Sequence, residues 1–143
     1  MSNCRSNIHL GVYGIFIKDT NILMIKKNRG PYAGKLDLPG GSIEFKENYI
    51  KALKRELLEE VSAKIKKSKF FSNEEYICKY TKNGELKEFH HVGLYFIVDL
   101  EIKQLKTVSD GHDSDGALFI PLKKLSQYKI APIAYKAIHK LIK

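Results

Sequence analysis

Apolar positions recur along the chain with two different periods. Short runs rich in β-branched and aromatic residues predict strands, whereas apolar residues spaced three and four apart predict helices. Residues 8–18 are apolar nearly throughout, which predicts a strand that is buried on both faces. Residues 22–25 predict a second apolar strand, and the polar turn before it indicates an antiparallel pair.

The clearest hairpin is predicted at residues 75–82 and 85–100. The Asn-Gly pair at 83–84 between these runs is the strongest short turn signal and favours a type I′ turn. A two-residue loop places Lys79 opposite Glu88, and this opposite-charge pair supports the register. The second strand is apolar enough to be central in its sheet.

Two helices are predicted by their apolar stripes. The first begins near Asn48, a favourable N-cap residue, and its stripe consists of Ile50, Leu53, Leu57 and Val61. The second begins at Ala131-Pro132, where proline suits the first turn. Its apolar face consists of Ile133, Ala137, Ile138, Leu141 and Ile142.

Two shorter segments complete the predicted elements. Charge alternates with apolar residues over 63–72, which favours an edge strand, and 117–121 predicts a short strand. The order is therefore sheet, helix, sheet, helix, without repeats or a linker. It predicts one domain over residues 1–143, of the α/β (α+β) class, with a mixed sheet covered on both faces.

The composition of the chain changes this picture little. No apolar run approaches the roughly 18 residues that span a bilayer, and the N-terminus lacks the apolar core of a signal peptide. We therefore expect a cytoplasmic protein that does not enter a membrane. Cys4 and Cys78 lack metal-type spacing and are predicted to be free thiols.

The net charge of +9 favours polyanionic partners. Lysine dominates over arginine and is scattered, which indicates attraction of small anions such as nucleotides rather than a dedicated nucleic-acid surface. Arg29 and Lys35 belong to the Gly/Pro-containing loop at 28–35. They are candidates for phosphate or base contact, and an ordinary solvated turn is the alternative.

Three carboxylates on the first helix are unusually close to one another. Glu56, Glu59 and Glu60 lie three and four apart, so they lean toward one side of the helix. Like charges at this spacing repel by roughly 0.2–0.5 kcal/mol per pair. A hard cation such as Mg²⁺ or Mn²⁺ would reverse the sign of that interaction, because oxygen ligands suit it.

The spacing of the glycines and charges around these carboxylates is more specific. Gly41 is followed after five residues by Glu47 and after seven more by Arg55-Glu56. This closely resembles the signature of the Nudix hydrolases, which here occupies residues 41–63. The matching residues are Gly41, Glu47, Arg55, Glu56, Leu57, Glu59 and Glu60. Departures from the signature are Ser62, where the family has glycine, and Ala63, where it usually has a larger aliphatic residue.

The resemblance implies an α–β–α sandwich and hydrolysis of a diphosphate linkage by water attack on phosphorus. It implies that the carboxylates of Glu56, Glu59 and Glu60 bind Mg²⁺ or Mn²⁺, with the Gly40 carbonyl as a further ligand. Glu47 would pair with Arg55, and Arg55 would hold Glu56 in place. Ser62 lies at the helix end and touches no ligand position.

The general base is left open between two regions. Some family members use the box glutamate that corresponds to Glu56, and others use a carboxylate from a distant loop. In this chain Asp113 or Asp115 would fill that place, with Glu88 as a third candidate. The alternative for the loop is a polar segment with Asx-turn chemistry. The adjacent His90 and His91 point to opposite faces of a strand, so they are not expected to share one metal.

The substrate is less explicit than the reaction. The resemblance implies a nucleoside triphosphate or another compound linked through a nucleoside diphosphate. Ile130 stands where the family's oxidised-guanine sanitiser has asparagine, which disfavours 8-oxo-guanine. Capped or triphosphorylated RNA is disfavoured too, because no long RNA-binding extension is present.

A monomer or homodimer is expected. The alternative function is a non-catalytic Nudix module that binds a nucleotide or RNA for regulation.

Overall fold

The structure is a computed structural model and describes residues 8–143. Its elements in chain order are β1 (Ile8–Ile15), β2 (Ile17–Lys18), β3 (Asn21–Lys27), β4 (Leu36–Asp37), β5 (Gly40–Ser42), α1 (Tyr49–Val61), β6 (Ala63–Lys82), β7 (Glu85–Ile102), β8 (Ser114–Pro121), the 3₁₀ helix η1 (Leu122–Gln127) and α2 (Pro132–Ile142). The strands form two sheets. The first has the order β5-β1-β7-β6, and the second has the order β2-β3-β4, with β8 paired to β3.

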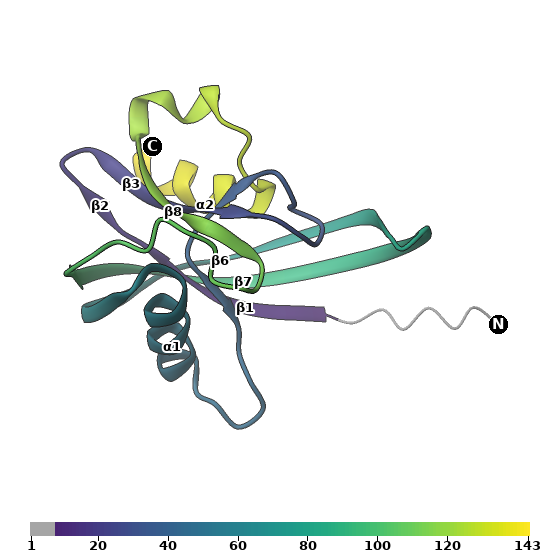
Figure 1. Cartoon of the computed structure of the whole chain (residues 1–143), viewed down its shortest axis with the longest axis horizontal. Coiled ribbons are helices and arrows are strands. Elements are labelled where there is room, and N and C mark those ends of the chain that lie inside the picture. The colour runs from purple at the N-terminus through teal and green to yellow at the C-terminus, as the bar shows by residue number, and fades with distance from the viewer. Residues whose placement is uncertain (1–7) are drawn as a thin grey trace.

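The two long helices lie on opposite sides of the strands (Figure 1). One apolar core packs α2, through residues such as Ile133 and Ile138, against both sheets. The other core packs α1 through Leu53 and Leu57. Strands β1 and β7 run parallel, while the other pairs are antiparallel. The predicted mixed α–β–α sandwich is therefore confirmed, although its strands divide between two sheets.

The predicted hairpin is confirmed and is longer than expected. Asn83 and Gly84 both have positive φ, at 53° and 77°, as a type I′ turn requires. Lys79 lies opposite Glu88 in the register. The edge strand expected over 63–72 is confirmed, since β6 lies at the edge of its sheet. It is not separate from the hairpin, because β6 runs on through the polar residues at 72–75 with two shifts of register along its length. In Figure 1 this hairpin projects beyond the body of the molecule.

The expectation for residues 8–18 was wrong in two respects. Strand β1 ends at Ile15 and pairs in parallel with β7, and only β2 pairs with β3. Its first residues are not buried on both faces, since Ile8 and Leu10 are 64% and 43% exposed. The same run of apolar residues occurs in a strand that is covered along its whole length and in a strand whose first residues are left uncovered. The sequence pattern therefore cannot tell the two apart.

Helix α1 begins as predicted, because the Asn48 side chain accepts a hydrogen bond of 2.9 Å from the Lys51 amide. It ends at Ser62 in the left-handed conformation, with φ of 59°. Of the three carboxylates on this helix, Glu60 is buried, at only 2% exposure. Its neighbour Val61 is buried as predicted.

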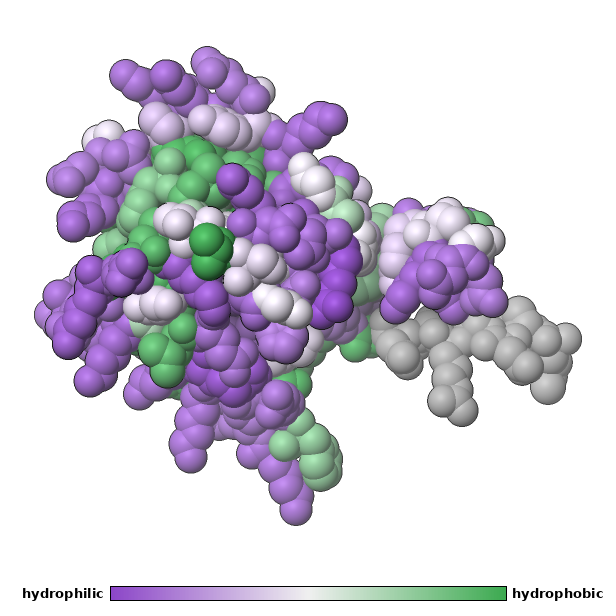
Figure 2. Space-filling view, in the orientation of Figure 1, coloured by the Kyte–Doolittle hydropathy of each residue, from purple (hydrophilic) through white to green (hydrophobic). Residues whose placement is uncertain are grey.

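Helix α2 also begins as predicted, with Pro132 in its first turn. Ile133, Ala137 and Ile138 are buried, whereas Ile142 at the last turn is 47% exposed, contrary to expectation. The face of the molecule in Figure 2 is mostly hydrophilic. Within residues 8–143, no helix is both long and apolar enough to cross a membrane. Cys78 is a free thiol, and Cys4 lies outside the described residues.

Candidate functional site

The Gly40-Gly41 segment brings β5 against the second half of α1. The Gly40 amide donates a hydrogen bond of 2.7 Å to Oε1 of Glu60. Gly40 has φ of +146°, and a Cβ there would lie 2.1 Å from the Val12 carbonyl oxygen, so only glycine fits. Burial raises the pKa of Glu60 well above its usual range, although the Gly40 hydrogen bond acts in the opposite direction.

Arg55 links the carboxylates that precede and follow it. Its Nε and one terminal nitrogen donate to the two oxygens of Glu47, at 2.8 and 2.9 Å. The other terminal nitrogen donates to Oε1 of Glu56 at 2.9 Å. The hydrogen bonds from Arg55 lower the pKa of Glu47 to about 2. Both contacts implied by the resemblance are thus present, and they fix the direction of the Glu56 carboxylate.

Glu56 lies directly beneath Gly41. A Cβ at Gly41 would come within 2.7 Å of the carboxyl carbon of Glu56, so the glycine leaves the space that this group fills. Burial raises the pKa of Glu56, although Arg55 opposes the shift. Glu59 is half exposed and lies 3.6 Å from Arg55. The helix therefore presents one buried, one half-buried and one exposed carboxylate.

A second segment adds carboxylates to this helix. Glu60, Asp110 and Asp113 each offer an oxygen, and these oxygens lie within 4.8 Å of one another. Asp110 and Asp113 come from the loop between β7 and β8. The Gly40 amide is the single hydrogen-bond donor found for the Glu60 carboxylate within residues 8–143. A buried carboxylate that is so sparsely neutralised, beside two others, suits a hard divalent cation.

The loop aspartates differ in their surroundings. Asp113 forms an ion pair with Lys27 at the end of β3. Burial opposes the charge of Asp113, yet the Lys27 contact lowers its pKa below the usual value. Asp115 instead accepts a hydrogen bond of 2.8 Å from the Asn28 side chain and lies outside the acidic cluster. Glu88 faces Lys79 on the hairpin and is outside it too.

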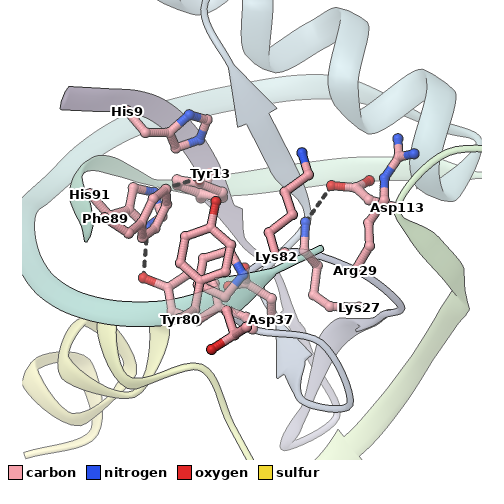
Figure 3. A pocket seen from close by; sticks show the side chains of 14 residues that line it. His9, Tyr13, Lys27, Arg29, Asp37, Tyr80, Lys82, Phe89, His91 and Asp113 are labelled. Carbon is pink, nitrogen blue, oxygen red and sulfur yellow. Dashed lines mark hydrogen bonds and ion pairs between the residues drawn. The ribbon is translucent and has the colours of Figure 1, made fainter. Parts of the chain in front are cut away.

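A cavity of about 370 Å³ is lined in part by Asp113 of the acidic cluster (Figure 3). Its walls come from β1, from β3 and the loop at 28–35, from β4, from the end of β6, from β7 and from the loop before β8. The aromatic side chains in the walls are His9, Tyr13, Tyr32, Tyr80, Phe89 and His91. The charged side chains are Lys27, Arg29, Asp37, Lys82 and Asp113. Lys27 and Asp113 thus belong to both the cavity and the edge of the acidic cluster.

His91 ties two tyrosines together in the cavity wall. Its Nε2 lies 2.7 Å from the Tyr13 hydroxyl, and its Nδ1 lies 2.9 Å from the Tyr32 hydroxyl. Burial lowers the pKa of His91 to about 3. His90 points to the other face of the sheet, where its Nε2 lies 2.7 Å from Glu75. The expected division of the two histidines is therefore confirmed.

The two basic candidates of the loop at 28–35 are separated. Arg29 lines the cavity, whereas Lys35 lines a different hollow, beside Lys26 and Lys129. The sequence patterns did not single out Asp37, which is buried in the cavity wall. A lone acid within an otherwise apolar stretch just before the glycine pair was the one available signal.

Several known proteins resemble the chain in sequence. The model of the NUDIX domain family matches residues 7–141. An ADP-ribose pyrophosphatase of Methanocaldococcus jannaschii is 33% identical over 116 residues, which cover 81% of this chain and 63% of that protein. An 8-oxo-dGTP diphosphatase of Buchnera aphidicola is 40% identical over 72 residues, covering 50% of this chain and 55% of that protein. The matched region thus spans less than two thirds of each of these relatives.

Solved structures share the fold at lower identity. A MutT NUDIX hydrolase from Burkholderia pseudomallei has a TM-score of 0.74 at 22% identity, covering 95% of this chain and 99% of that one. The NUDIX domain of Shewanella oneidensis NrtR, in complex with ADP ribose, has a TM-score of 0.63 at 14% identity, covering 96% and 88%. With the family model matched over nearly the whole chain and this fold in place, the protein belongs to the Nudix family.

Proposed function

We propose that this protein is a divalent-metal-dependent pyrophosphohydrolase that cleaves a diphosphate linkage in a nucleotide by water attack on phosphorus. The observation that carries the proposal is the acidic cluster of Glu60, Asp110 and Asp113, one member of which, Asp113, also lines an aromatic cavity. The names of the curated relatives, an ADP-ribose pyrophosphatase and an 8-oxo-dGTP diphosphatase, support a substrate of this class.

The metal site in this proposal is built on α1. Glu56, Glu59 and Glu60 would hold Mg²⁺ or Mn²⁺, together with the Gly40 carbonyl and a loop aspartate. Asp110 and Asp113 both place an oxygen within 4.8 Å of Glu60. The ion would neutralise phosphate oxygens and acidify a water molecule. Burial raises the pKa values of Glu56 and Glu60 because it disfavours their negative charges. A bound cation would offset that cost by stabilising the charged carboxylates.

The remaining side chains of the site position the reactants. Arg55 holds the Glu56 carboxylate through its hydrogen bond of 2.9 Å, and this leaves the second oxygen of Glu56 to accept a proton from water. Glu56 is therefore our first choice for the general base, with Asp113 as the second. Asp113 is less suited while it is paired with Lys27.

The cavity would hold the nucleoside part of the substrate. Its aromatic rings offer surfaces for stacking on a base. Arg29 and Lys82 line it, and neither has an ion-pair partner within the described part of the chain. Their positive charges would attract the phosphates and hold the diphosphate next to the acidic cluster.

A panel of nucleotides tests the proposal. The protein is incubated with Mg²⁺ and, separately, with EDTA, together with nucleoside triphosphates, dinucleoside polyphosphates, ADP-ribose and other nucleotide sugars. The reactions are run in ¹⁸O-labelled water, and their products are then separated by chromatography. We expect Mg²⁺-dependent cleavage of at least one substrate, with a single ¹⁸O atom in a phosphorus-containing product. Label in neither phosphorus product would contradict attack on phosphorus.

The alternative function is regulatory binding of a nucleotide or RNA without turnover. Measurable binding without release of phosphate, pyrophosphate or monophosphate from any member of the panel would favour that module. The acidic cluster argues for the enzyme, because a binding module has no use for a buried carboxylate beside two others.

A further inference from the structure

Asp37 is a buried carboxyl group in the wall of the cavity with little to satisfy it. The residue is 3% exposed and lines the cavity. Its Oδ1 accepts a hydrogen bond of 2.8 Å from the amide of the next residue, Leu38. No other hydrogen bond or ion pair to this carboxyl group is found within residues 8–143. A buried carboxyl group with a single hydrogen-bond donor destabilises the fold. A ligand that supplies further N–H groups would offset that cost.

Strand pairing fixes where Asp37 lies in the wall. It belongs to β4 and lies opposite Ile25 of β3, two residues before Lys27. A carboxylate held on a strand presents its free oxygen in one direction. Burial raises the pKa of Asp37 to about 6, and the nearby Lys27 opposes the shift. Above pH 7 the group is therefore ionised and can only accept hydrogen bonds.

The same wall also holds one available hydroxyl proton. His91 is neutral at ordinary pH because its pKa lies at about 3, so it has one N–H group and one lone pair. One of its two tyrosine partners, Tyr13 or Tyr32, must donate to it, and the other must accept from it. The accepting tyrosine keeps its own O–H proton for another acceptor. The wall thus combines a carboxylate acceptor with a hydroxyl donor.

We propose that Asp37 selects the base and that the cavity takes the edge of a guanine-type purine, whose N1–H and N2–H groups donate to the Asp37 carboxylate. The tyrosine hydroxyl donates to O6 of the same edge, and Phe89 and Tyr80 cover the ring faces. Adenine fits less well, since its N1 lone pair would face a carboxylate oxygen. The inference rests on the proposed function, because it assumes that a nucleotide occupies this cavity.

Calorimetric titration without metal tests the base preference separately from catalysis. The wild-type protein, in EDTA at pH 8, is titrated with dGMP, 8-oxo-dGMP and dAMP; the first two share the same edge. We expect at least one guanine nucleotide to bind more tightly than dAMP. In Asp37→Asn, an amide donor would face N1–H and N2–H, so the ratio of guanine to adenine affinity should fall about 10- to 100-fold.

Glu74→Gln is the matched control. Glu74 is another buried carboxylate, at 7% exposure, but it pairs with Lys140 at 2.8 Å and does not line the cavity. This variant should keep the affinity ratio of the wild type. Circular dichroism checks that both variants fold, and Asp37→Ser replaces Asp37→Asn if the latter does not.

Three results would overturn the assignment. They are tighter binding of dAMP than of both guanine nucleotides by the wild type, an unchanged ratio in a folded Asp37 variant, and no binding of any of the three. Base preference without turnover on the nucleotide panel would leave Asp37 assigned and refute the hydrolase. Turnover without base preference would do the reverse.

Discussion

The two halves of the site differ in how far apart their residues lie along the chain. The acidic half is mostly one continuous segment, from the Gly40-Gly41 pair through Glu47 to Glu60, and one loop completes it. The cavity half is assembled from six separate segments, which include β1, β4 and the end of β6. Lys27 and Asp113 form the ion pair at which the two halves meet.

In the proposed function, the acidic half would carry out the reaction and the cavity half would determine the choice of substrate. The acidic half is held by short-range hydrogen bonds, such as those of Arg55 with Glu47 and Glu56. In the proposed function it would act on the phosphates. Any diphosphate linkage offers it the same oxygens. The cavity half is held by contacts between distant elements, such as Tyr13 and Tyr32 with His91. In the proposed function it would meet the part of the substrate that varies. Variants of the first half should lower turnover of every substrate, whereas variants of the second should change the preference among substrates.

The largest expected effect comes from Glu56→Gln. It removes a proposed metal ligand and the proposed general base, so kcat should fall by about 10²- to 10⁴-fold for every substrate. Turnover is measured with saturating Mg²⁺, and Glu101→Gln, an exposed acid on β7, serves as the control. If Asp113→Asn costs far more than Glu56→Gln, the base lies in the loop and the helix only holds the metal.

Arg55→Lys should have the next largest effect. A lysine ammonium cannot replace the fork that joins Glu47 and Glu56, so the Glu56 carboxylate loses its fixed direction. We expect kcat to fall about 10- to 100-fold, together with a higher Mg²⁺ requirement. Lys54→Ala, on the exposed side of the same helix, is the control. An unchanged Mg²⁺ dependence would show that Arg55 does not act through Glu56.

His91→Gln should alter the pH dependence of stability. The pKa of His91 is about 3 in the fold, below its usual 6.5. As pH falls below 6.5, the unfolded chain binds a proton that the folded chain excludes, so wild-type stability loses about 1.4 kcal/mol per pH unit through this group. Glutamine does not titrate. The difference in unfolding free energy between wild type and variant should therefore shrink by that amount per unit.

Urea unfolding at pH 7.5, 6 and 5 measures this difference. A difference that stays constant over this range would mean that the pKa of His91 is not lowered in the fold, so that the folded protein also protonates the ring between pH 7.5 and pH 5. The tyrosine hydroxyls would then both accept from the ring, and the available hydroxyl proton would no longer be restricted to one of them.

Ser62→Gly should have the smallest effect. Ser62 holds the left-handed conformation at the end of α1, which glycine adopts without steric cost. We expect a gain of about 1 kcal/mol, or a rise in Tm of about 3 °C, with activity unchanged. A marked loss of activity would mean that the end of the helix takes part in the reaction.

The sequence predicted the two halves unequally, and the reason is physical. Spacing along one helix determines which side chains share a side, so Glu56, Glu59 and Glu60 could be grouped without coordinates. Asn48 and the Asn-Gly turn at 83–84 likewise act through local hydrogen bonds and φ angles. Helix ends and tight turns are thus readable from a few residues.

The remaining features depend on packing between distant segments. Nothing along the sequence distinguishes Asp113, which meets Lys27, from Asp115, which meets Asn28. The parallel pairing of β1 with β7 joins strands some 80 residues apart in sequence and leaves no periodic signal. The burial of Asp37 follows from the same kind of long-range assembly.

The central claim is that the carboxylates of α1 hold a divalent cation that the reaction requires. Mn²⁺ binding to Glu60→Gln and to wild type, followed by electron paramagnetic resonance alongside Mg²⁺-dependent turnover, tests it most directly. We predict that the variant keeps its fold and its Tm, binds Mn²⁺ at least tenfold more weakly, in line with the roughly 10- to 100-fold that even outer-shell partners contribute, and loses most of its turnover. Near-normal Mn²⁺ binding and turnover in Glu60→Gln would contradict the account.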